Sequence, residues 1–201
     1  MFTGIIESLG EVVTITPEGS NHHLEIRSAL TPELSVDQSI SHNGVCLTVT
    51  AVQDTTYWVT AIDETLHKSN LGSLQSGDPI NLERCMPAHG RFDGHIVQGH
   101  VDLTGVCQEV KEQDGSWLYT FSFQPTNEAY LVVEKGSITV NGVSLTCFDV
   151  HDEGFTVAII PYTYEHTNFH RLQPGHSVNL EFDILGKYIQ RIMSRQATAN
   201  R

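Results

Sequence analysis

The sequence predicts an all-β protein made of two tandem six-stranded antiparallel closed barrels, followed by a C-terminal α-helix. Three separate stretches of the first half of the chain recur in the same order in the second half. Each half also contains about six short runs with strand-like composition, whereas the tail has a helical pattern. We therefore expect one domain at residues 1–95, a second at 96–183, and a helix with its tail at 184–201.

The repeated stretches keep a nearly constant spacing. Residues 42–50 read HNGVCLTVT, and residues 140–148 read VNGVSLTCF, 98 positions later. Residues 65–83 recur at 163–181 with the same offset, and GIIE at residues 4–7 is echoed by GHVD at 99–102, 95 positions later. This period is too long for a solenoid, so it indicates a tandem duplication of a whole domain.

The strand-like runs follow the same duplication. In the first half they cover residues 11–16, 23–27, 40–42, 45–51, 57–61 and 79–82. In the second half they cover residues 105–110, 118–123, 137–140, 143–150, 155–160 and 177–181. Residues 65–70 and 163–168 have few β-branched residues, which predicts a short helical turn in each half. Six short strands favour a closed barrel because closure removes the exposed edges of the sheet.

An Asn-Gly pair opens the fourth strand of each half. Such a pair before a run of Val, Leu and Thr predicts a hairpin turn, because both residues tolerate positive φ. Beyond the turn, Val45, Leu47 and Val49 should face a core, and Cys46 and Thr48 should face outward. The second copy alternates in the same way, with Ser144 and Thr146 on the outward face. Each strand can therefore support a core while it presents small polar groups to a ligand.

The tail predicts an amphipathic helix. Its apolar residues fall at helical spacing on one face: Ile184, Leu185, Tyr188, Ile189, Ile192 and Met193. This face should pack either on a barrel of its own chain or on another copy of the helix, and the pattern alone does not choose between them. Lys187, Arg191 and Arg195 form a basic row that we expect in solvent.

Composition limits the class of partner. The formal net charge is −13, which argues against a nucleic acid or an anionic membrane as partner. The first 30 residues lack a cationic segment followed by an apolar run, so we expect a cytoplasmic protein. The four cysteines have no zinc-like spacing and should be thiols. We expect Cys85, Cys107 and Cys147 to be buried and Cys46 to be the exception.

Two differences between the copies have chemical consequences. His100 occupies the place of Ile5, and Cys46 occupies the place of Ser144. A neutral imidazole can hold or move a proton near pH 7, and a thiol can be a nucleophile when its pKa is lowered. A purely structural role for His100 also fits the spacing. His95 and His100 could suggest a metal pair, but five positions along a strand place them on opposite faces, and no further ligand completes a set.

Six segments of this chain together resemble the riboflavin synthase family of the alpha-chain type. They are MFTGIIE, HNGVCLTVT, ETLHKSNLG, GDPINLER, GHIVQGHVD and KGSITVNGVSLT, in the order of the family. The resemblance implies two similar barrels and a homotrimer assembled through the C-terminal helices. It also implies a dismutation without metal or redox cofactor, in which a four-carbon unit passes between two molecules of 6,7-dimethyl-8-ribityllumazine. The products are riboflavin and 5-amino-6-ribitylaminouracil.

The resemblance also carries site residues onto this chain, with an active site between the N-terminal barrel of one subunit and the C-terminal barrel of its neighbour. The pocket of the N-terminal barrel should use Gly4, Ile5, Ile6, Cys46, Leu47, Thr48, Thr60, Ala61, Ile62, Asp63, Glu64 and Thr65. The pocket of the C-terminal barrel should use Gly99, His100, Val101, Lys135, Val143, Ser144, Leu145, Thr146, Ala158, Ile159, Ile160, Pro161, Tyr162 and Thr163.

Roles follow from the same resemblance. His100 is the candidate that removes a proton from the lumazine 7-methyl group, and threonines such as Thr48 and Thr146 are candidates for ribityl or ring contacts. Ser39, Cys46, Ser144 or a water could supply the nucleophile at C7. Asn141 stands where some members of the family have Asp. An association with lumazine synthase is a further partner that the resemblance allows, and lumazine proteins, which bind the ligand without chemistry, are the main rival.

Overall fold

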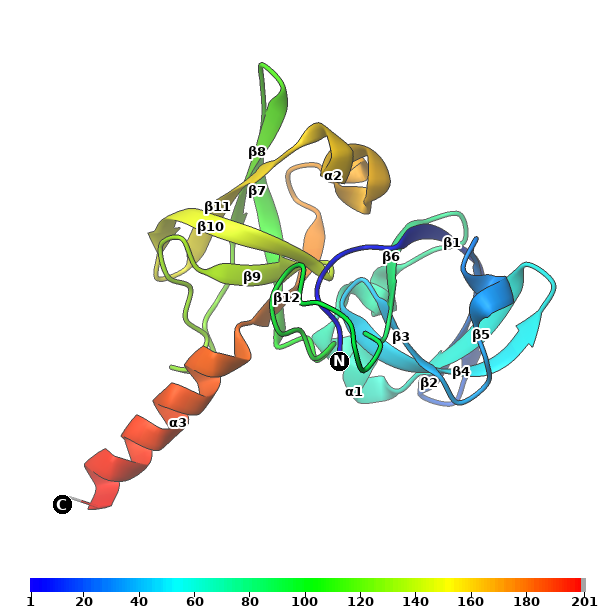
Figure 1. The fold of residues 1–201 in the computed structure, drawn as a ribbon, viewed down its shortest axis with the longest axis horizontal. Helices are drawn as coiled ribbons and strands as arrows, with labels where there is room; N and C mark the ends of the chain where they lie inside the picture. The colour runs from blue at the N-terminus through cyan, green and yellow to red at the C-terminus, as the bar shows by residue number, and fades with distance from the viewer. Residues whose placement is uncertain (200–201) are drawn as a thin grey trace.

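The computed structural model describes residues 1–199, with side chains described as far as Ala197. It contains two closed antiparallel barrels side by side and a long helix that projects away from them (Figure 1). The N-barrel consists of β1 (Ser8–Glu18), β2 (Asn21–Arg27), β3 (Ser39–His42), β4 (Val45–Gln53), β5 (Thr56–Ala61) and β6 (Pro79–Arg84). The C-barrel consists of β7 (Leu103–Gln113), β8 (Ser116–Ser122), β9 (Ser137–Val140), β10 (Val143–His151), β11 (Gly154–Ile159) and β12 (Ser177–Phe182). The predicted fold class is confirmed.

The helical elements also occur at equivalent places in the two barrels. A short helix precedes the last strand of each, namely α1 (Asp63–Lys68) and α2 (Pro161–His166). Each is followed by a 3₁₀ turn, η2 (Asn70–Ser73) or η3 (Asn168–Arg171), and η1 (Thr31–Glu33) lies between β2 and β3. The strand orders are β1-β2-β5-β4-β3-β6 and β10-β11-β8-β7-β12-β9, which are the same cycle of pairings at equivalent strands.

The alternation of side chains gives each barrel its own core. Val45, Leu47 and Val49 are buried in the N-barrel, while Cys46 is half-buried and Thr48 is exposed on the outer face, as predicted. The C-barrel core is richer in aromatic rings, including Tyr119, Phe121, Phe155 and Phe169. Each Asn-Gly turn has both residues at positive φ, with Asn43 at 47° and Gly44 at 83°, and Asn141 at 48° and Gly142 at 79°.

The two Asn-Gly turns meet back to back where the barrels touch. A Cβ on Gly44 would lie 2.9 Å from the backbone N of Gly142, so only glycine fits this contact. The exposed backbone groups of the turns are bound across the interface by asparagines of β6 and β12. Asn81 donates its side-chain amide to the carbonyl of Asn141 (2.9 Å), and Asn179 donates to the carbonyl of Asn43 (2.8 Å).

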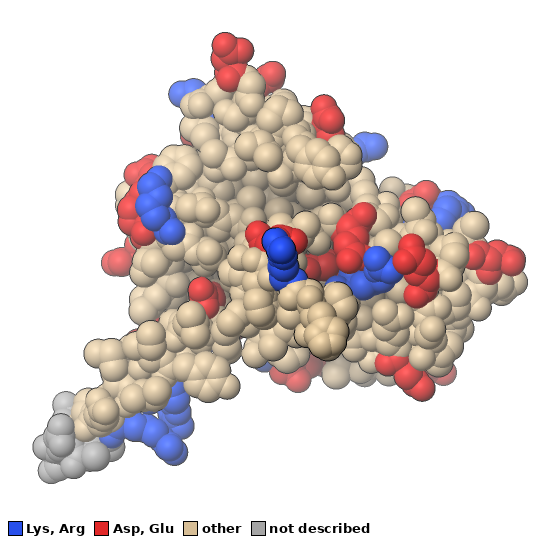
Figure 2. Space-filling view, viewed as in Figure 1, with Lys and Arg blue, Asp and Glu red and all other residues tan. Residues whose placement is uncertain are grey.

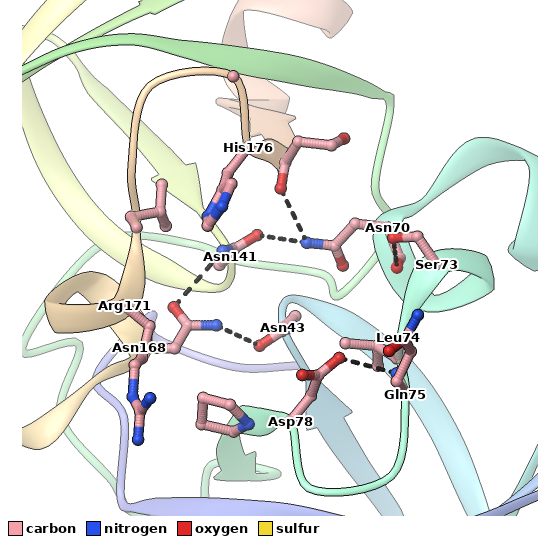
Figure 3. Close-up of a pocket in the computed structure, with 14 residues that line it drawn as sticks. Asn43, Asn70, Ser73, Leu74, Gln75, Asp78, Asn141, Asn168, Arg171 and His176 are labelled. Carbon is pink, nitrogen blue, oxygen red and sulfur yellow. Dashed lines mark hydrogen bonds between the residues drawn. The ribbon is translucent and has the colours of Figure 1, made fainter.

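Asparagines of the two 3₁₀ turns complete this network, in which a cavity of about 530 Å³ opens between the barrels (Figure 3). The Asn168 backbone N–H donates to Oδ1 of Asn81 (2.8 Å), and that of Asn70 donates to Oδ1 of Asn179 (2.6 Å). The Asn168 side chain donates to Oδ1 of Asn43 (3.0 Å), and the Asn70 side chain donates to Oδ1 of Asn141 (3.1 Å). The interface between the barrels is therefore held by reciprocal hydrogen bonds related by an approximate two-fold axis.

The segment before each barrel crosses onto the other barrel. The first leading segment, residues 2–7, is held to its own barrel by Glu83, whose carboxylate accepts from the backbone N–H of Thr3 (2.6 Å) and Gly4 (2.9 Å). Its far side binds the C-barrel, because the Ser144 N–H donates to the Gly4 carbonyl (2.8 Å). Ile6 packs against the C-barrel core.

The second leading segment, residues 97–102, mirrors this arrangement. The Glu181 carboxylate accepts from the backbone N–H groups of Gln98 (2.7 Å), Gly99 (2.9 Å) and His100 (2.9 Å). The Cys46 N–H donates to the Gly99 carbonyl (2.8 Å), and Val101 packs against the N-barrel core. Burial raises the pKa of both carboxyl groups, Glu83 and Glu181, and their bonds to the leading segments act against that shift.

The tail forms α3 (Ile184–Ala199), as predicted. Its apolar row is exposed, with Leu185 at 58%, Tyr188 at 63%, Ile189 at 58% and Ile192 at 56% of full exposure, so docking on its own chain is excluded. In Figure 2 the projecting helix is largely tan, with basic side chains along its lower edge. The basic row is not wholly in solvent as expected, because Lys187 forms a partly buried ion pair with Asp102. Residues 200–201 of the predicted tail lie outside the described residues.

Among residues 1–199, none of the helices combines the length and the apolar character that crossing a bilayer requires.

Replacing Asn81 with Leu tests the interface network. The change leaves the Asn141 carbonyl and the Asn168 N–H without partners, so we expect a loss of roughly 2–5 kcal/mol in the free energy of unfolding. Urea denaturation of N81L and of its pseudo-symmetric equivalent N179L should give similar losses. Gln124→Ala, at an exposed position, is the control and should cost well under ~1 kcal/mol. A loss in N81L as small as that of the control would contradict the assigned role of the network.

Replacing Gly99 with Ala tests the crossing of the leading segments. Gly99 has φ +78°, and a Cβ there would lie 2.7 Å from the Phe2 ring and 2.8 Å from Cβ of Cys46. Gly77→Ala is the matched control, because Gly77 has φ +93° with nothing within 4 Å of a new Cβ. We expect G77A to cost about 1 kcal/mol from backbone strain alone and G99A to cost roughly 1–3 kcal/mol more from overpacking. Equal urea midpoints for the two variants would show that the segment does not pass this closely over β4.

Candidate active site

The first candidate pocket lies on the outer face of the N-barrel, where the second leading segment passes over β4. It is a cavity of about 270 Å³ lined by Val45, Cys46, Glu64, Thr65, Lys68, Ser69, Gly99, His100 and Val101. β4 supplies Cys46, α1 supplies Thr65, and the leading segment supplies His100. The pocket therefore brings together the thiol and the imidazole that distinguish the two copies of the repeat.

This arrangement corrects one prediction. The sequence assigned Gly4–Ile6 to the N-barrel pocket and Gly99–Val101 to the C-barrel pocket, each with its own repeat. The structure exchanges them, because Gly99 pairs with Cys46 of the N-barrel and Gly4 pairs with Ser144 of the C-barrel. The physical reason is the buried glutamate at the end of each barrel, which holds the leading segment between the two barrels. The exchange places His100 in the pocket that contains Cys46.

Cys46 is a protonated thiol in this environment. Burial raises the pKa of the Cys46 thiol, and a hydrogen bond from Ser39 opposes this shift without cancelling it. The register across β3 places Ser39 opposite Thr48 and Ser41 opposite Cys46, so these side chains share the outer face of the barrel. Cys85, expected to be buried, is only half-buried at the end of β6, whereas Cys107 and Cys147 are buried as predicted.

The corresponding site on the outer face of the C-barrel has a different pair of groups. Nδ1 of His95 lies 2.7 Å from Oγ of Ser144. Burial lowers the pKa of His95, and the negative charge of Asp183 partly opposes that shift. Asp183 takes the place of Cys85 in the repeat, at the same 98-residue offset as Ser144 and Cys46. From the sequence, His95 was considered only as half of a possible metal pair with His100. The presence of Asp183 at the position equivalent to Cys85 was the signal that could have pointed to His95.

The remaining predicted residues divide into three groups by their surroundings. Leu47, Ala61, Val143 and Ile159 are core residues, so only their backbone groups can face a ligand. Leu145 is partly buried against the C-barrel core, and Thr60 is half-buried, with its hydroxyl 2.9 Å from Nδ1 of His23. The residues with a free outer face are Ile5, Thr48, Ile62, Asp63, Glu64, Lys135, Thr146, Ala158, Ile160, Pro161 and Tyr162, with Thr163 half-buried beside them.

Lys135 has an unusual conformation at the start of β9. Its φ is 63°, and its Nζ lies 5.2 Å from the centre of the Phe148 ring. The equivalent position in the N-barrel is Asp37, which has φ 70°. The same turn with positive φ thus carries a cation in one copy and an anion in the other. Within residues 1–199, no three His, Cys, Asp or Glu side chains are grouped to hold a metal ion.

The chain is similar to a known domain family and to named proteins along nearly its whole length. The Lumazine binding domain family matches the chain twice, over residues 3–85 and 98–183. The riboflavin synthase of Actinobacillus pleuropneumoniae is 42% identical over 197 residues, covering 98% of this chain and 91% of that protein. The riboflavin synthase of Bacillus subtilis (strain 168) is 39% identical over 196 residues, covering 97% of this chain and 91% of that protein.

A solved structure shares the fold at lower sequence identity. The crystal structure of LumP complexed with 6,7-dimethyl-8-(1'-D-ribityl) lumazine superposes with a TM-score of 0.82 and 19% identity, covering 90% of this chain and 99% of that chain. This likeness concerns the fold alone. Two matches to the Lumazine binding domain, together with curated relatives that align along nearly the whole chain, show that this protein belongs to the riboflavin synthase family.

Proposed function

We propose that this protein is a riboflavin synthase that converts two molecules of 6,7-dimethyl-8-ribityllumazine into riboflavin and 5-amino-6-ribitylaminouracil. The relatives that cover nearly the whole chain have this activity in their names. In the proposed reaction, a four-carbon unit passes from one lumazine to the other without a metal or redox cofactor.

The observation that carries this proposal is a pair of corresponding sites with different reactive side chains. On each barrel a leading segment pairs in the same way with an outer strand, Gly99 with Cys46 of β4 and Gly4 with Ser144 of β10. A dismutation needs two copies of one substrate that meet different fates, so it needs two similar binding frames with unequal chemistry. Cys46 and His100 mark the N-barrel pocket, and Ser144 and His95 mark the corresponding site on the C-barrel. Holding both substrates in attack geometry would then supply a large part of the rate enhancement.

Roles for individual residues follow from this scheme. His100 accepts a proton from the 7-methyl group of the lumazine in the N-barrel pocket, which it reaches from the second leading segment. Backbone groups of β4 and β10 bind the rings, and Thr48, Thr65, Thr146 and Thr163 contact ring or ribityl oxygens. Ser39, Cys46, Ser144 and a water remain the candidates for the nucleophile at C7, and the raised pKa of the Cys46 thiol lowers the fraction of Cys46 that is thiolate.

The assembly that we propose is a homotrimer formed through α3. The exposed apolar row of this helix, from Leu185 to Met193, lies on an element that projects away from both barrels (Figure 1). In the trimer, the N-barrel of one subunit faces the C-barrel of the next, so that the two lumazines meet between subunits. The domain bounds 1–95, 96–183 and 184–201, a cytoplasmic location and an association with lumazine synthase stay predictions of the same scheme.

Incubation with the lumazine alone tests the reaction. In metal-free buffer, riboflavin absorbance should rise, with two lumazines consumed for each riboflavin formed. His100→Ala should lower kcat by roughly 10²–10⁴-fold, because general-base catalysis typically contributes that much. His89→Ala, an exposed substitution in the linker between the barrels, is the control and should retain the wild-type rate.

Two other outcomes would contradict the proposal. Tight binding of the lumazine without turnover would make the protein a ligand-carrying binder of the lumazine-protein kind. No binding at all would exclude both functions.

A charge placed in the apolar row of α3 tests the trimer. We expect Ile189→Asp to dissociate the assembly, because each subunit would bury a carboxylate in the shared helix interface. Ser194→Asp adds the same charge on the opposite face of the same helix, at an exposed position, and should leave the assembly intact. Sedimentation velocity of the wild type and both variants gives the masses. A wild-type monomer, or a trimer that persists in I189D, would refute assembly through this face.

A further inference from the structure

The acidic residue at the end of each leading segment is paired with a cation, and the cation comes from a different element in each copy. Asp102 ends the second leading segment, and Glu7 is its equivalent in the first. In the N-barrel, Glu7 accepts from Nε of Arg84 in β6 (2.6 Å). Phe182 of β12 occupies the place of Arg84, so the C-barrel has no cation at this position. Lys187 of α3 supplies one instead, with its Nζ 2.5 Å from Oδ2 of Asp102.

This ion pair lies in a partly buried place at the base of α3. The side chains of Lys187 and Asp102 are 21% and 12% exposed, so salt and water screen their attraction less than that of a surface pair. The same Oδ2 of Asp102 accepts from the Phe182 backbone N–H (2.9 Å), which fixes the carboxylate against the end of β12. The bond from Nε2 of Gln190 in α3 to Glu128 (3.1 Å) is exposed by comparison. Lys187 is therefore the partly buried contact that sets the direction of α3.

The segment that carries His100 is bound to the same end of β12. The His100 backbone N–H donates to Oε2 of Glu181 (2.9 Å), and the Asp102 backbone N–H donates to the Leu180 carbonyl (2.9 Å). α3 begins just after this strand and projects away from both barrels (Figure 1). A displacement of α3 at Lys187 is therefore passed to the backbone that positions His100.

The charge of Lys187 also acts on the glutamate that holds this segment. Burial raises the pKa of Glu181, and its bonds to the Gln98 and His100 amides act against that shift. The positive charge of Lys187 lowers the pKa of Glu181 as well, whereas the negative charge of Asp102 raises it. Lys187 thus favours the ionised carboxylate that the leading segment requires.

We propose that Lys187 is a positioning residue, which fixes the direction of α3 against the second leading segment through Asp102. In the proposed trimer, α3 packs on its copies, so its direction sets where the C-barrel of one subunit stands relative to the N-barrel of the next. The same ion pair holds the segment that carries His100. Assembly through α3 is thus coupled to the placement of the group that takes the 7-methyl proton. This inference rests on the proposed function.

Substitution of Lys187 tests this coupling with the full-length protein and 6,7-dimethyl-8-ribityllumazine. We expect Lys187→Met to lower kcat by roughly 10–10²-fold, because a misplacement of about 1 Å caused far from the chemistry can cost that much. The lumazine affinity from fluorescence titration should stay close to the wild-type value, because the lining of the N-barrel pocket is unchanged. Sedimentation velocity should still give a trimer, because the apolar row of α3 is intact.

Two further variants act as controls for the charge of Lys187. Lys187→Arg keeps a cation that can reach Asp102 and should restore most of the wild-type kcat. Arg191→Met removes the next cation of the same row, at an exposed position, and should leave kcat unchanged.

A double variant separates positioning from stability. Lys187→Met leaves the Asp102 carboxylate partly buried without a cation, which should lower the thermal midpoint. Asp102→Asn keeps an oxygen that can accept from the Phe182 N–H but carries no charge. D102N/K187M should therefore recover much of the thermal midpoint, while its kcat stays as low as that of K187M because α3 is still not fixed. A merely structural ion pair would not separate these two readouts.

Four results would overturn the positioning role while leaving the proposed function intact. They are a K187M variant with wild-type kcat, a K187M variant that sediments as a monomer, an R191M variant as slow as K187M, and a D102N/K187M variant whose kcat recovers together with its thermal midpoint. Wild-type protein that is monomeric, or that binds the lumazine without turnover, would instead overturn the proposed function itself.

Discussion

The pockets of this protein depend on the way two buried carboxylates hold the leading segments between the barrels. Glu83 and Glu181 are 4% and 3% exposed, and the bonds described for their carboxylates come from backbone N–H groups and one threonine hydroxyl. Desolvating a carboxylate is costly unless several donors surround it, so each glutamate requires its leading segment to follow one path. That path places Gly99 on Cys46 and Gly4 on Ser144. The composition of each pocket is therefore a consequence of how a buried charge is satisfied elsewhere.

The asparagine network likewise satisfies buried polar groups, here at the contact between the barrels. Two hairpin turns that meet back to back would leave carbonyl groups buried without partners, and an apolar interface could not supply donors. Asn81 and Asn179 provide them, each reaching into the turn of the other barrel. Because every member of the network has a defined partner geometry, the two barrels dock in one relative orientation. Each leading segment can then form the same backbone hydrogen bond to the opposite barrel, with 2.8 Å between Ser144 N and Gly4 O and 2.8 Å between Cys46 N and Gly99 O. The backbone around the two sites is therefore alike.

The sequence was sufficient for the features that depend on neighbours along the chain. Strand positions, the positive-φ turns at Asn43 and Asn141, and the helix beginning at Ile184 follow from local periodicity and turn chemistry, and the structure has all of them. The assignment of each leading segment to the pocket of its own barrel was wrong. The exchange depends on a contact between residues 46 and 99 that no local pattern encodes.

Buried polar pairs were also out of reach of the sequence. His42 is buried with its ring between the Ile40 carbonyl and the Tyr57 hydroxyl, where the C-barrel has Val140 and Phe155 instead. This joint replacement of two residues shows in the repeat alignment, but its meaning becomes clear only once the two side chains are known to touch. The His95–Ser144 pair is the same kind of feature, because its members come from a linker and a strand 49 residues apart.

Duplication explains why such differences gather on the outer faces of the strands. A core position is constrained by the packing of its own barrel, so a change there must be matched by a neighbour, as with His42 and Tyr57. Outward positions near the leading segments lie outside the two cores, and there the copies differ at Cys46 and Ser144, at Cys85 and Asp183, and at Ile5 and His100. The backbone that holds a ligand stays the same while the side chains that act on it diverge. Two molecules of one substrate can thus be bound alike and treated differently.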